Sequence, residues 1–225
     1  MKKILVVLLV SLLVVLLVFI PKGNSAKWNG RLVDKEHDIV LEFEGALDFA
    51  GNKNLRDSIV ANVLGNDFAR YGNNRVLRKY AKSSLRSFVA TTDSVLTGVV
   101  LHTKMDGNIV CANEKYVCFK RTLSTSTSDD GDAWMTTCNC YVFDAKTGHI
   151  VQEEDIFSKQ EMRALREMLV ERIKTMALED GMNFDYKRVR LNANFLITDS
   201  TITYIFNPYE IAEASVGVVE ITIDR

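Results

Sequence analysis

Few side chains in this 225-residue chain have the types and spacing that metal or cofactor chemistry requires. None of the three histidines lies at a metal-binding spacing from another histidine, a cysteine or a pair of carboxylates. Zinc sites use closely spaced C-x-x-C pairs, whereas six residues separate Cys111 from Cys118 and one separates Cys138 from Cys140. A phosphate-binding loop and a Gly-x-Ser-x-Gly motif are also absent from the sequence. We therefore expect no metal site and no cofactor.

Carboxylates offer acid–base chemistry as an alternative. Residues 153–155 read Glu-Glu-Asp, and Glu210 lies in a loop after a predicted strand. Paired carboxylates can act as general acid and base, so a glycan hydrolase that uses Asp155 or Glu210 is one hypothesis. The structural interpretation is that residues 153–155 are solvated charge near a helix start and that Glu210 satisfies backbone amides.

Two loops hold the side chains that could face a ligand. Loops at strand ends often carry binding residues, and Pro208, which cannot donate a backbone hydrogen bond, ends a predicted strand. The second loop is a polar, acidic stretch followed by Trp134, which could anchor a protein or glycan or else pack in the core. The candidate binding residues are Asn207, Tyr209, Glu210, Trp134, Asp129, Asp130 and Asp132.

Residues 1–26 read as a targeting segment. Lys2 and Lys3 precede an apolar run over residues 4–20, which a single serine interrupts and Pro21 ends. Its length lies between a signal-peptide core of about 7–15 residues and a membrane-spanning helix of about 20. A cleaved signal and a retained single anchor both fit. Each predicts an extracytoplasmic protein, in the periplasm or at the cell surface.

The part of the chain after this leader is mildly acidic. Without the three lysines of the leader, 25 basic and 29 acidic residues remain, a net charge of −4. This balance argues against nucleic acid or an anionic membrane surface as the main partner. Membrane contact is expected only through the N-terminal segment, and a basic partner would suit the charge.

The four cysteines allow disulfides in an exported protein. An even cysteine count is typical of disulfide pairing, and four cysteines allow three pairings. If the polar loop 124–132 closes a hairpin, Cys118 falls opposite Cys138. A disulfide there would close a loop of about 20 residues and stabilise the fold by roughly 3 kcal/mol. Free buried thiols are the alternative.

The hydrophobic pattern predicts an α+β fold with a mostly antiparallel sheet. Alternating apolar residues predict a strand at 39–44, and helical spacing predicts two short helices, at 54–65 and 76–88. Asp106-Gly107 predicts a tight hairpin turn. Further strands are expected at 116–122 and 136–143.

The second half of the chain contains the longest predicted helix. The segment 158–161 reads Ser-Lys-Gln-Glu, a capping box, and the helix that it opens ends at Gly181. Strands are expected at 195–197, at 201–206 and at 219–223. The long helix should pack on the sheet.

These patterns divide the chain into four parts. Residues 1–26 are a signal peptide or anchor, and the polar residues 27–38 are a tether. An N-terminal α+β module is expected over 39–105, followed by a C-terminal α+β domain over 106–225.

One part of the sequence resembles a known family. The resemblance is carried by three stretches: the turn Asp144-Ala145-Lys146-Thr147-Gly148, the segment Glu154-Asp155-Ile156-Phe157, and Asn194-Phe195 followed by Tyr204 through Ala212. The family is a bacterial extracytoplasmic domain of unknown function. It forms the ectodomain of the lysozyme-sensing anti-sigma-V factor and the non-catalytic N-terminal region of a peptidoglycan deacetylase. The match covers about residues 135–225, and residues 39–105 look similar to the smaller module that usually precedes it.

The resemblance implies an α+β fold similar to a subdomain of the heat-shock cognate ATPases, without their ATP site, because a fold does not transfer function. Relatives often have glycine and histidine before the second core strand, whereas residues 129–135 here contain no histidine. Ligand contacts of that loop are therefore not carried over. We expect neither a cytoplasmic sigma-binding segment before the leader nor a deacetylase domain after Arg225.

The sequence therefore predicts a non-enzymatic binding or sensing module at the bacterial cell envelope. The expected ligand is an envelope protein or a peptidoglycan-type glycan, and the resemblance suggests a lysozyme-like protein. A glycan hydrolase and a structural envelope protein are the alternatives.

Overall fold

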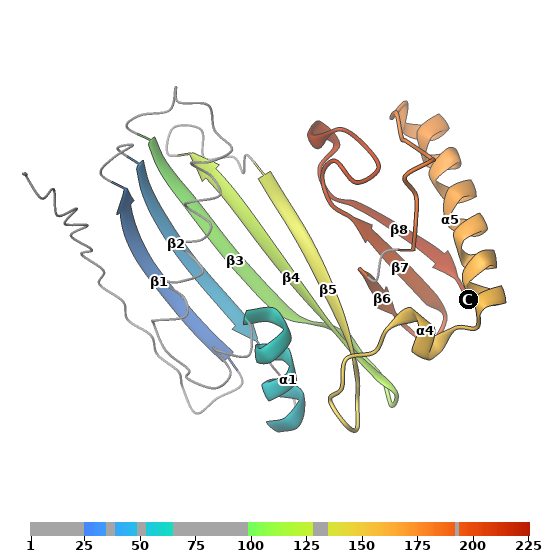
Figure 1. Ribbon diagram of the computed structural model, residues 1–225, viewed down its shortest axis with the longest axis horizontal. Coiled ribbons are helices and arrows are strands. Elements are labelled where there is room, and N and C mark those ends of the chain that lie inside the picture. Colours follow the sequence, from blue (N-terminus) through green and yellow to red (C-terminus); the bar gives the residue numbers. More distant parts are fainter. Residues whose placement is uncertain (1–24, 35–38, 49–52, 65–98, 128–134, 192–193) are drawn as a thin grey trace, which may run out of the picture.

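The computed structural model describes residues 25–34, 39–48, 53–64, 99–127, 135–191 and 194–225 (Figure 1). Within these residues the chain forms two sheets, one long helix and short helical segments. The strands of the first sheet are β1 (Ser25–Asp34), β2 (Ile39–Asp48), β3 (Val99–Ala112), β4 (Tyr116–Thr127) and β5 (Met135–Asp144). Those of the second are β6 (Phe195–Ile197), β7 (Thr201–Phe206) and β8 (Val219–Asp224). The helices are α1 (Lys53–Leu64), α4 (Glu153–Ile156), α5 (Lys159–Asp180) and the 3-10 turn η1 (Ala214–Val216).

The predicted α+β class is confirmed. The larger sheet has the order β1-β2-β3-β4-β5 and is mixed, because β2 and β3 run parallel while their neighbours pair antiparallel. The smaller sheet, β6-β7-β8, is antiparallel throughout. The first predicted short helix is α1, and the second, at 76–88, lies outside the described residues.

Part of the segment that we predicted to be leader and tether is a strand. Residues 25–34 form β1, which pairs with β2 along its whole length, from Ser25 opposite Asp48 to Asp34 opposite Ile39. The polar composition that suggested a tether is compatible with the outermost strand of a sheet, where water can solvate one edge.

The predicted hairpin at Asp106-Gly107 is wrong, because β3 continues through both residues and Gly107 pairs with Arg121 on β4. A Cβ atom on Gly107 would lie 2.6 Å from Leu47 Cδ2 and 2.8 Å from Phe119 Cζ. The glycine therefore permits close packing within a strand rather than a turn. The predicted boundary between residues 105 and 106 consequently falls inside β3.

Helix α1 packs by one face and is tied to the larger sheet at its C-terminal end. Leu55, Ile59 and Val63 recur at helical spacing and are buried. Arg121 on β4 donates to the Val63 carbonyl (3.3 Å) and to Asn139 Oδ1 (2.6 Å). This arginine satisfies one of the carbonyls that a helix end leaves without an intrahelical partner.

The long helix begins and ends as predicted. Ser158 Oγ accepts from Glu161 N (3.3 Å), Glu161 Oε2 accepts from Ser158 N (2.7 Å), and Gly181 follows the helix with φ +66°. Leu169 and Ile173 on α5 are fully buried in one hydrophobic core with residues of the smaller sheet. Cys118 and Val142 of the larger sheet belong to the same core.

The smaller sheet lies between α5 and the β4–β5 end of the larger sheet, as Figure 1 shows. None of the helices in the described part of the chain combines the length and apolarity needed to cross a membrane. Residues 1–24 of the predicted targeting segment lie outside the described residues.

Candidate functional site

The two sheets are joined by asparagine side chains. Asn194 is buried beside the outer edge of β5, where its Oδ1 accepts from Cys140 N (2.7 Å) and its Nδ2 donates to the Cys138 carbonyl (2.9 Å). Asn194 Nδ2 also donates to the Ile205 carbonyl on β7 (3.0 Å). Asn207 Oδ1 accepts from Cys138 N (2.6 Å). These amides satisfy backbone groups at the last strand of the larger sheet, the position at which such groups otherwise lack partners.

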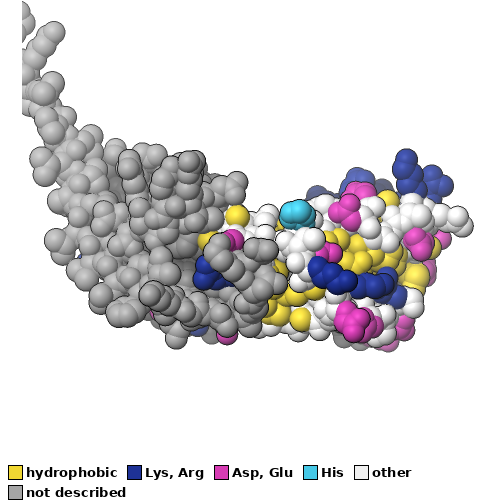
Figure 2. Space-filling view, turned by 90° about the horizontal axis from the view of Figure 1, so that it is seen from below, with side chains coloured by type: hydrophobic (Ala, Val, Ile, Leu, Met, Phe, Trp, Pro, Cys, Tyr) yellow, Lys and Arg dark blue, Asp and Glu magenta, His cyan; other side chains and the backbone are white. Residues whose placement is uncertain are grey.

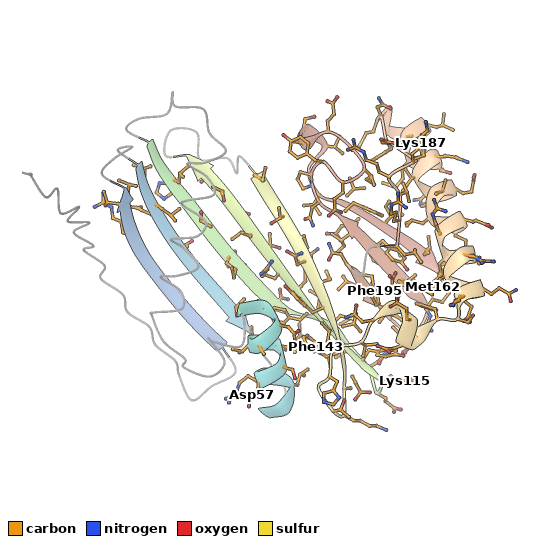
Figure 3. The ribbon with its side chains drawn as sticks, in the orientation of Figure 1. Asp57, Lys115, Phe143, Met162, Lys187 and Phe195 are labelled. Atoms are coloured by element: carbon orange, nitrogen blue, oxygen red, sulfur yellow. The ribbon has the colours of Figure 1, made fainter. Side chains whose placement is uncertain are left out.

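Figure 3 labels a residue on each side of this junction, Phe143 on β5 and Phe195 on β6. Phe143 and Phe195 are both fully buried. Apolar packing across the junction comes from Val142 of β5, which shares one hydrophobic core with Phe195, and the two asparagines add hydrogen bonds to β5. Asn207, which we predicted to face a ligand, contributes its side-chain oxygen to this junction.

The turn that follows β7 holds a tyrosine in an unusual backbone conformation. Glu210 N donates to the Asn207 carbonyl (3.1 Å), with Pro208 and Tyr209 as the two central residues. Tyr209 has φ +70° and is the one non-glycine residue with positive φ in the described part of the chain. This is the pattern of a type II turn, in which glycine usually occupies the third position.

Hydrogen bonds hold this turn in place. The Glu210 carboxylate accepts from Asn207 N (3.0 Å), and Arg188 Nη1 donates to the Tyr209 carbonyl (3.3 Å). A non-glycine residue in the left-handed region costs roughly 1 kcal/mol, and such strain persists only where its surroundings enforce it. Glu210 therefore acts first as the residue that closes the turn, in agreement with its structural interpretation.

A surface pocket of about 460 Å³ lies beside this turn. The Asp185 N–H donates to the Ile211 carbonyl (2.7 Å), which brings the segment after α5 against the segment after β7. Arg188 Nε lies 3.1 Å from Asp185 Oδ2. In Figure 3, Lys187 marks this end of the molecule, at the far end of α5 from α4. The pocket is lined by Asn183, Phe184, Asp185, Arg188, Tyr209, Ile211, Ala212 and Glu213.

Of the predicted binding residues, Tyr209 lines this pocket, and its side chain is 63% exposed. Trp134 and the acidic loop with Asp129, Asp130 and Asp132 lie outside the described residues. Sequence reasoning missed the polar lining residues Asn183, Asp185, Arg188 and Glu213. The sequence offers no polar run there, because Asn183 and Asp185 alternate with apolar and aromatic residues after Gly181. Only the contact between residues 185 and 211 places this segment beside Tyr209.

Two of the adjacent carboxylates at 153–155 lie in different environments. Glu153 is buried, whereas Asp155 Oδ2 accepts from Gln152 N (2.9 Å) at the start of α4. Burial, together with the nearby Glu153 carboxyl, raises the pKa of Tyr204 above its ordinary value. In the described part of the chain, no group of three His, Cys, Asp or Glu side chains is placed to hold a metal ion.

The predicted register between Cys118 and Cys138 is wrong. Cys118 lies opposite Val142, and Cys138 lies opposite Thr122, four positions further along β4. The shift arises because the polar residues 124–127 extend β4 instead of beginning the loop. All four cysteines, which lie in described strands, are free thiols.

Charge is mixed on the face of the described residues that Figure 2 shows. On the face drawn in Figure 2, lysine and arginine side chains alternate with acidic ones and with apolar surface. Lys120 Nζ lies 2.5 Å from Glu220 Oε1 and so joins β4 to β8. No patch of a single sign is visible on the described part of this face.

Comparison with known proteins defines the fold. Residues 154–225 match the model of a family described as "Protein of unknown function (DUF3298)". A DUF3298 family structure from Bacteroides fragilis NCTC 9343 is similar to the chain with a TM-score of 0.59 and 14% sequence identity, over 95% of this chain and 91% of that one. No curated protein matches the chain.

A second DUF3298 family structure, from Pseudomonas aeruginosa PAO1, is similar with a TM-score of 0.54 and 12% identity, over 95% of this chain and 90% of that one. At these identities the likeness shows the fold. The C-terminal part of the chain thus matches a family of unknown function, as the sequence resemblance indicated, and the whole chain has the fold of these two bacterial proteins.

Proposed function

We propose that the chain is a non-enzymatic binding or sensing module that acts outside the cytoplasm, at the bacterial cell envelope. The observation that carries this proposal is Tyr209. Tyr209 is 63% exposed and lies beside the pocket, and its backbone has a φ of +70°. Hydrogen bonds from Asn207 N to Glu210 and from Arg188 to the Tyr209 carbonyl hold the turn in place. Strained positions that the fold enforces cluster at binding and active sites.

The chemistry of the pocket suits a ligand with both apolar faces and hydrogen-bonding groups. The Tyr209 ring offers a contact face, while Asp185, Arg188 and Glu213 offer charged groups around it. Tyrosine and arginine are the residue types that most often dominate binding energy. A cell-wall glycan or a protein side chain could bind to these residues. The carboxylates of Asp185 and Glu213 and the net charge of −4 after the leader favour a basic protein. A lysozyme-like protein is one candidate.

The proposed location outside the cytoplasm rests on the apolar N-terminal segment and on the family resemblance of residues 135–225. That resemblance also includes the likeness to a heat-shock cognate ATPase subdomain. The anti-sigma-V ectodomain resembled here senses lysozyme, which supports a sensing role. The net charge of −4 after the leader supports a ligand other than nucleic acid.

The test is a binding measurement on the chain without residues 1–24, because β1 begins at Ser25. Titration calorimetry is run with lysozyme and, separately, with solubilised peptidoglycan fragments. We expect one of the two ligands to bind, and we expect Tyr209→Ala to weaken binding at least about tenfold, the usual effect of truncating an aromatic anchor. Tyr186→Ala is the matched control, because Tyr186 is an exposed tyrosine that does not line the pocket.

Tyr209→Gly separates binding from stability. Glycine adopts positive φ without strain, so this variant should unfold at the same or a higher temperature than the wild type and still fail to bind. Absence of binding to both ligands by the wild-type protein would contradict the proposal. Equal binding by the wild type and Tyr209→Ala would show that the ligand does not bind at this pocket.

The hydrolase alternative has a direct test in the same samples. Asp155 and Glu210 each close a local backbone turn through one carboxylate oxygen. We expect no release of reducing sugar from peptidoglycan by the wild-type protein. A reproducible activity that Asp155→Asn or Glu210→Gln abolishes would establish the hydrolase and overturn the proposal.

A further inference from the structure

Cys111 and Cys118 lie directly opposite each other on the antiparallel strands β3 and β4. Opposite residues on such strands have Cα atoms about 4.5–5.5 Å apart, and their side chains share one face of the sheet. A disulfide requires Cα atoms about 4.4–6.8 Å apart. The register therefore places the two cysteines within bridging distance without movement of the strands.

The two thiols converge on one backbone carbonyl. The Ile197 oxygen accepts from Cys111 Sγ at 3.5 Å and from Cys118 Sγ at 3.3 Å, so the two sulfur atoms are at most 6.8 Å apart. Ile197 N donates to Cys118 Sγ at 3.4 Å. The pair therefore lies where the end of β6 meets the larger sheet.

The two thiols have different environments. Cys118 is fully buried, whereas Cys111 is only partly buried. The hydrogen bond with Cys118 lowers the pKa of Cys111, and the same hydrogen bond together with burial raises the pKa of Cys118. Because the thiolate is the reactive form of cysteine, Cys111 is the member of the pair that reacts first.

The other two cysteines provide an internal contrast. Cys138 and Cys140 lie on one strand with a single residue between them, so their Cα atoms are separated by about 6.6–6.8 Å at the usual strand rise. Their Cβ bonds point in the same direction, so the Cβ atoms lie about as far apart as the Cα atoms, whereas a disulfide requires Cβ atoms about 3.5–4.5 Å apart. Bridging would therefore require the backbone to bend. Both are buried, against Ile205.

We propose that Cys111 and Cys118 form a redox-active dithiol that is oxidised to a cross-strand disulfide, while Cys138 and Cys140 remain thiols. The oxidant is a small disulfide such as oxidised glutathione. The Cys111 thiolate attacks one sulfur of the oxidant and releases the first small thiolate, which leaves a mixed disulfide. The Cys118 sulfur then attacks the Cys111 sulfur, and the second small thiol leaves with the proton from Cys118.

This exchange breaks the sulfur–sulfur bond of the oxidant and forms one in the protein. Two electrons and two protons pass from the protein to the oxidant, which becomes two thiols. The S–H donors to the Ile197 carbonyl are lost, and the end of the β3–β4 hairpin becomes covalently joined. The reaction can be followed on the purified protein and does not depend on the proposed ligand.

The test is peptide mapping of the full-length protein. The protein is incubated with oxidised glutathione, its free thiols are alkylated first without denaturant and then in denaturant, and it is digested with trypsin. Lys115 lies between the two cysteines, so cleavage there puts Cys111 and Cys118 in separate peptides. We expect one disulfide-linked pair of these peptides and alkylated thiols at Cys138 and Cys140. Recovery of Cys111 and Cys118 as alkylated thiols, or a disulfide with any other partner, would overturn the proposal.

Matched variants and a stability measurement complete the experiment. Cys138→Ser should keep the disulfide, whereas Cys111→Ser should abolish it and leave Cys118 alkylated. The oxidised wild type should melt roughly 5 °C above the reduced wild type, because a short closed loop restricts the unfolded chain. The same shift in Cys111→Ser would assign the effect to another site and would contradict the proposal.

Discussion

At the scale of single residues, Asn194 connects the two sheets. Its amide makes three hydrogen bonds to the backbone of β5 and β7, and the residue is only 9% exposed. Asn207 adds a fourth, to Cys138 N. The two asparagines of the family-like segment thus serve the junction between the sheets, and the neighbouring Tyr209 is left to face solvent.

We expect Asn194→Ala to lower the free energy of unfolding by about 2–4 kcal/mol. Its removal leaves the Cys140 N–H and the Cys138 carbonyl buried without this partner, and each such loss costs about 1–3 kcal/mol. Urea denaturation followed by circular dichroism measures the change. Asn108→Ala is the control, because the Asn108 side chain is exposed and contacts only its neighbour's carbonyl in the described part of the chain. A cost for Asn194→Ala no larger than for Asn108→Ala would contradict this account.

At the scale of elements, the strands of the larger sheet depend on close contacts that a local pattern does not reveal. Asp106-Gly107 has the composition of a hairpin turn, yet both residues lie inside β3. The choice is made by Leu47 from β2 and Phe119 from β4, whose side chains fill the space over Gly107. A two-residue signal of this kind is therefore outweighed by tertiary packing.

Gly107→Ala tests this packing. The added methyl would overlap Leu47 and Phe119, and overpacking of this kind costs about 1–3 kcal/mol. Replacement of Leu47 by alanine should make room, so we expect Gly107→Ala to cost less in the Leu47→Ala background than in the wild type. Thermal or urea unfolding of the four proteins of this double-mutant cycle measures the coupling. Additive costs would show that the glycine serves another purpose.

At the scale of the whole molecule, local and non-local features differ in how far the sequence predicts them. The capping box at 158–161, the stop at Gly181 and strands β6 to β8 follow from residues close in sequence, and they were predicted correctly. The parallel pairing of β2 with β3 and the register of β4 with β5 depend on distant segments. The pocket requires residues 183–188 to meet residues 209–213, and sequence reasoning identified only Tyr209 of its lining.

The two sheets should unfold together, because Cys118 and Val142 of the larger sheet share one core with α5 and the smaller sheet. Trp28 and Trp134 both precede residue 135, so tryptophan fluorescence reports on the N-terminal part of the chain while circular dichroism reports on all of it. In the wild type, we expect the urea transitions from the two signals to coincide, the behaviour of a cooperative unit. In the double variant Asn194→Ala/Asn207→Ala, the two transitions should separate, because three hydrogen bonds across the junction are lost. Coincident transitions in the double variant would show that the remaining contacts between the sheets, the shared core and the Lys120–Glu220 ion pair among them, are enough to couple them. Separate transitions in the wild type would show that the junction does not couple them.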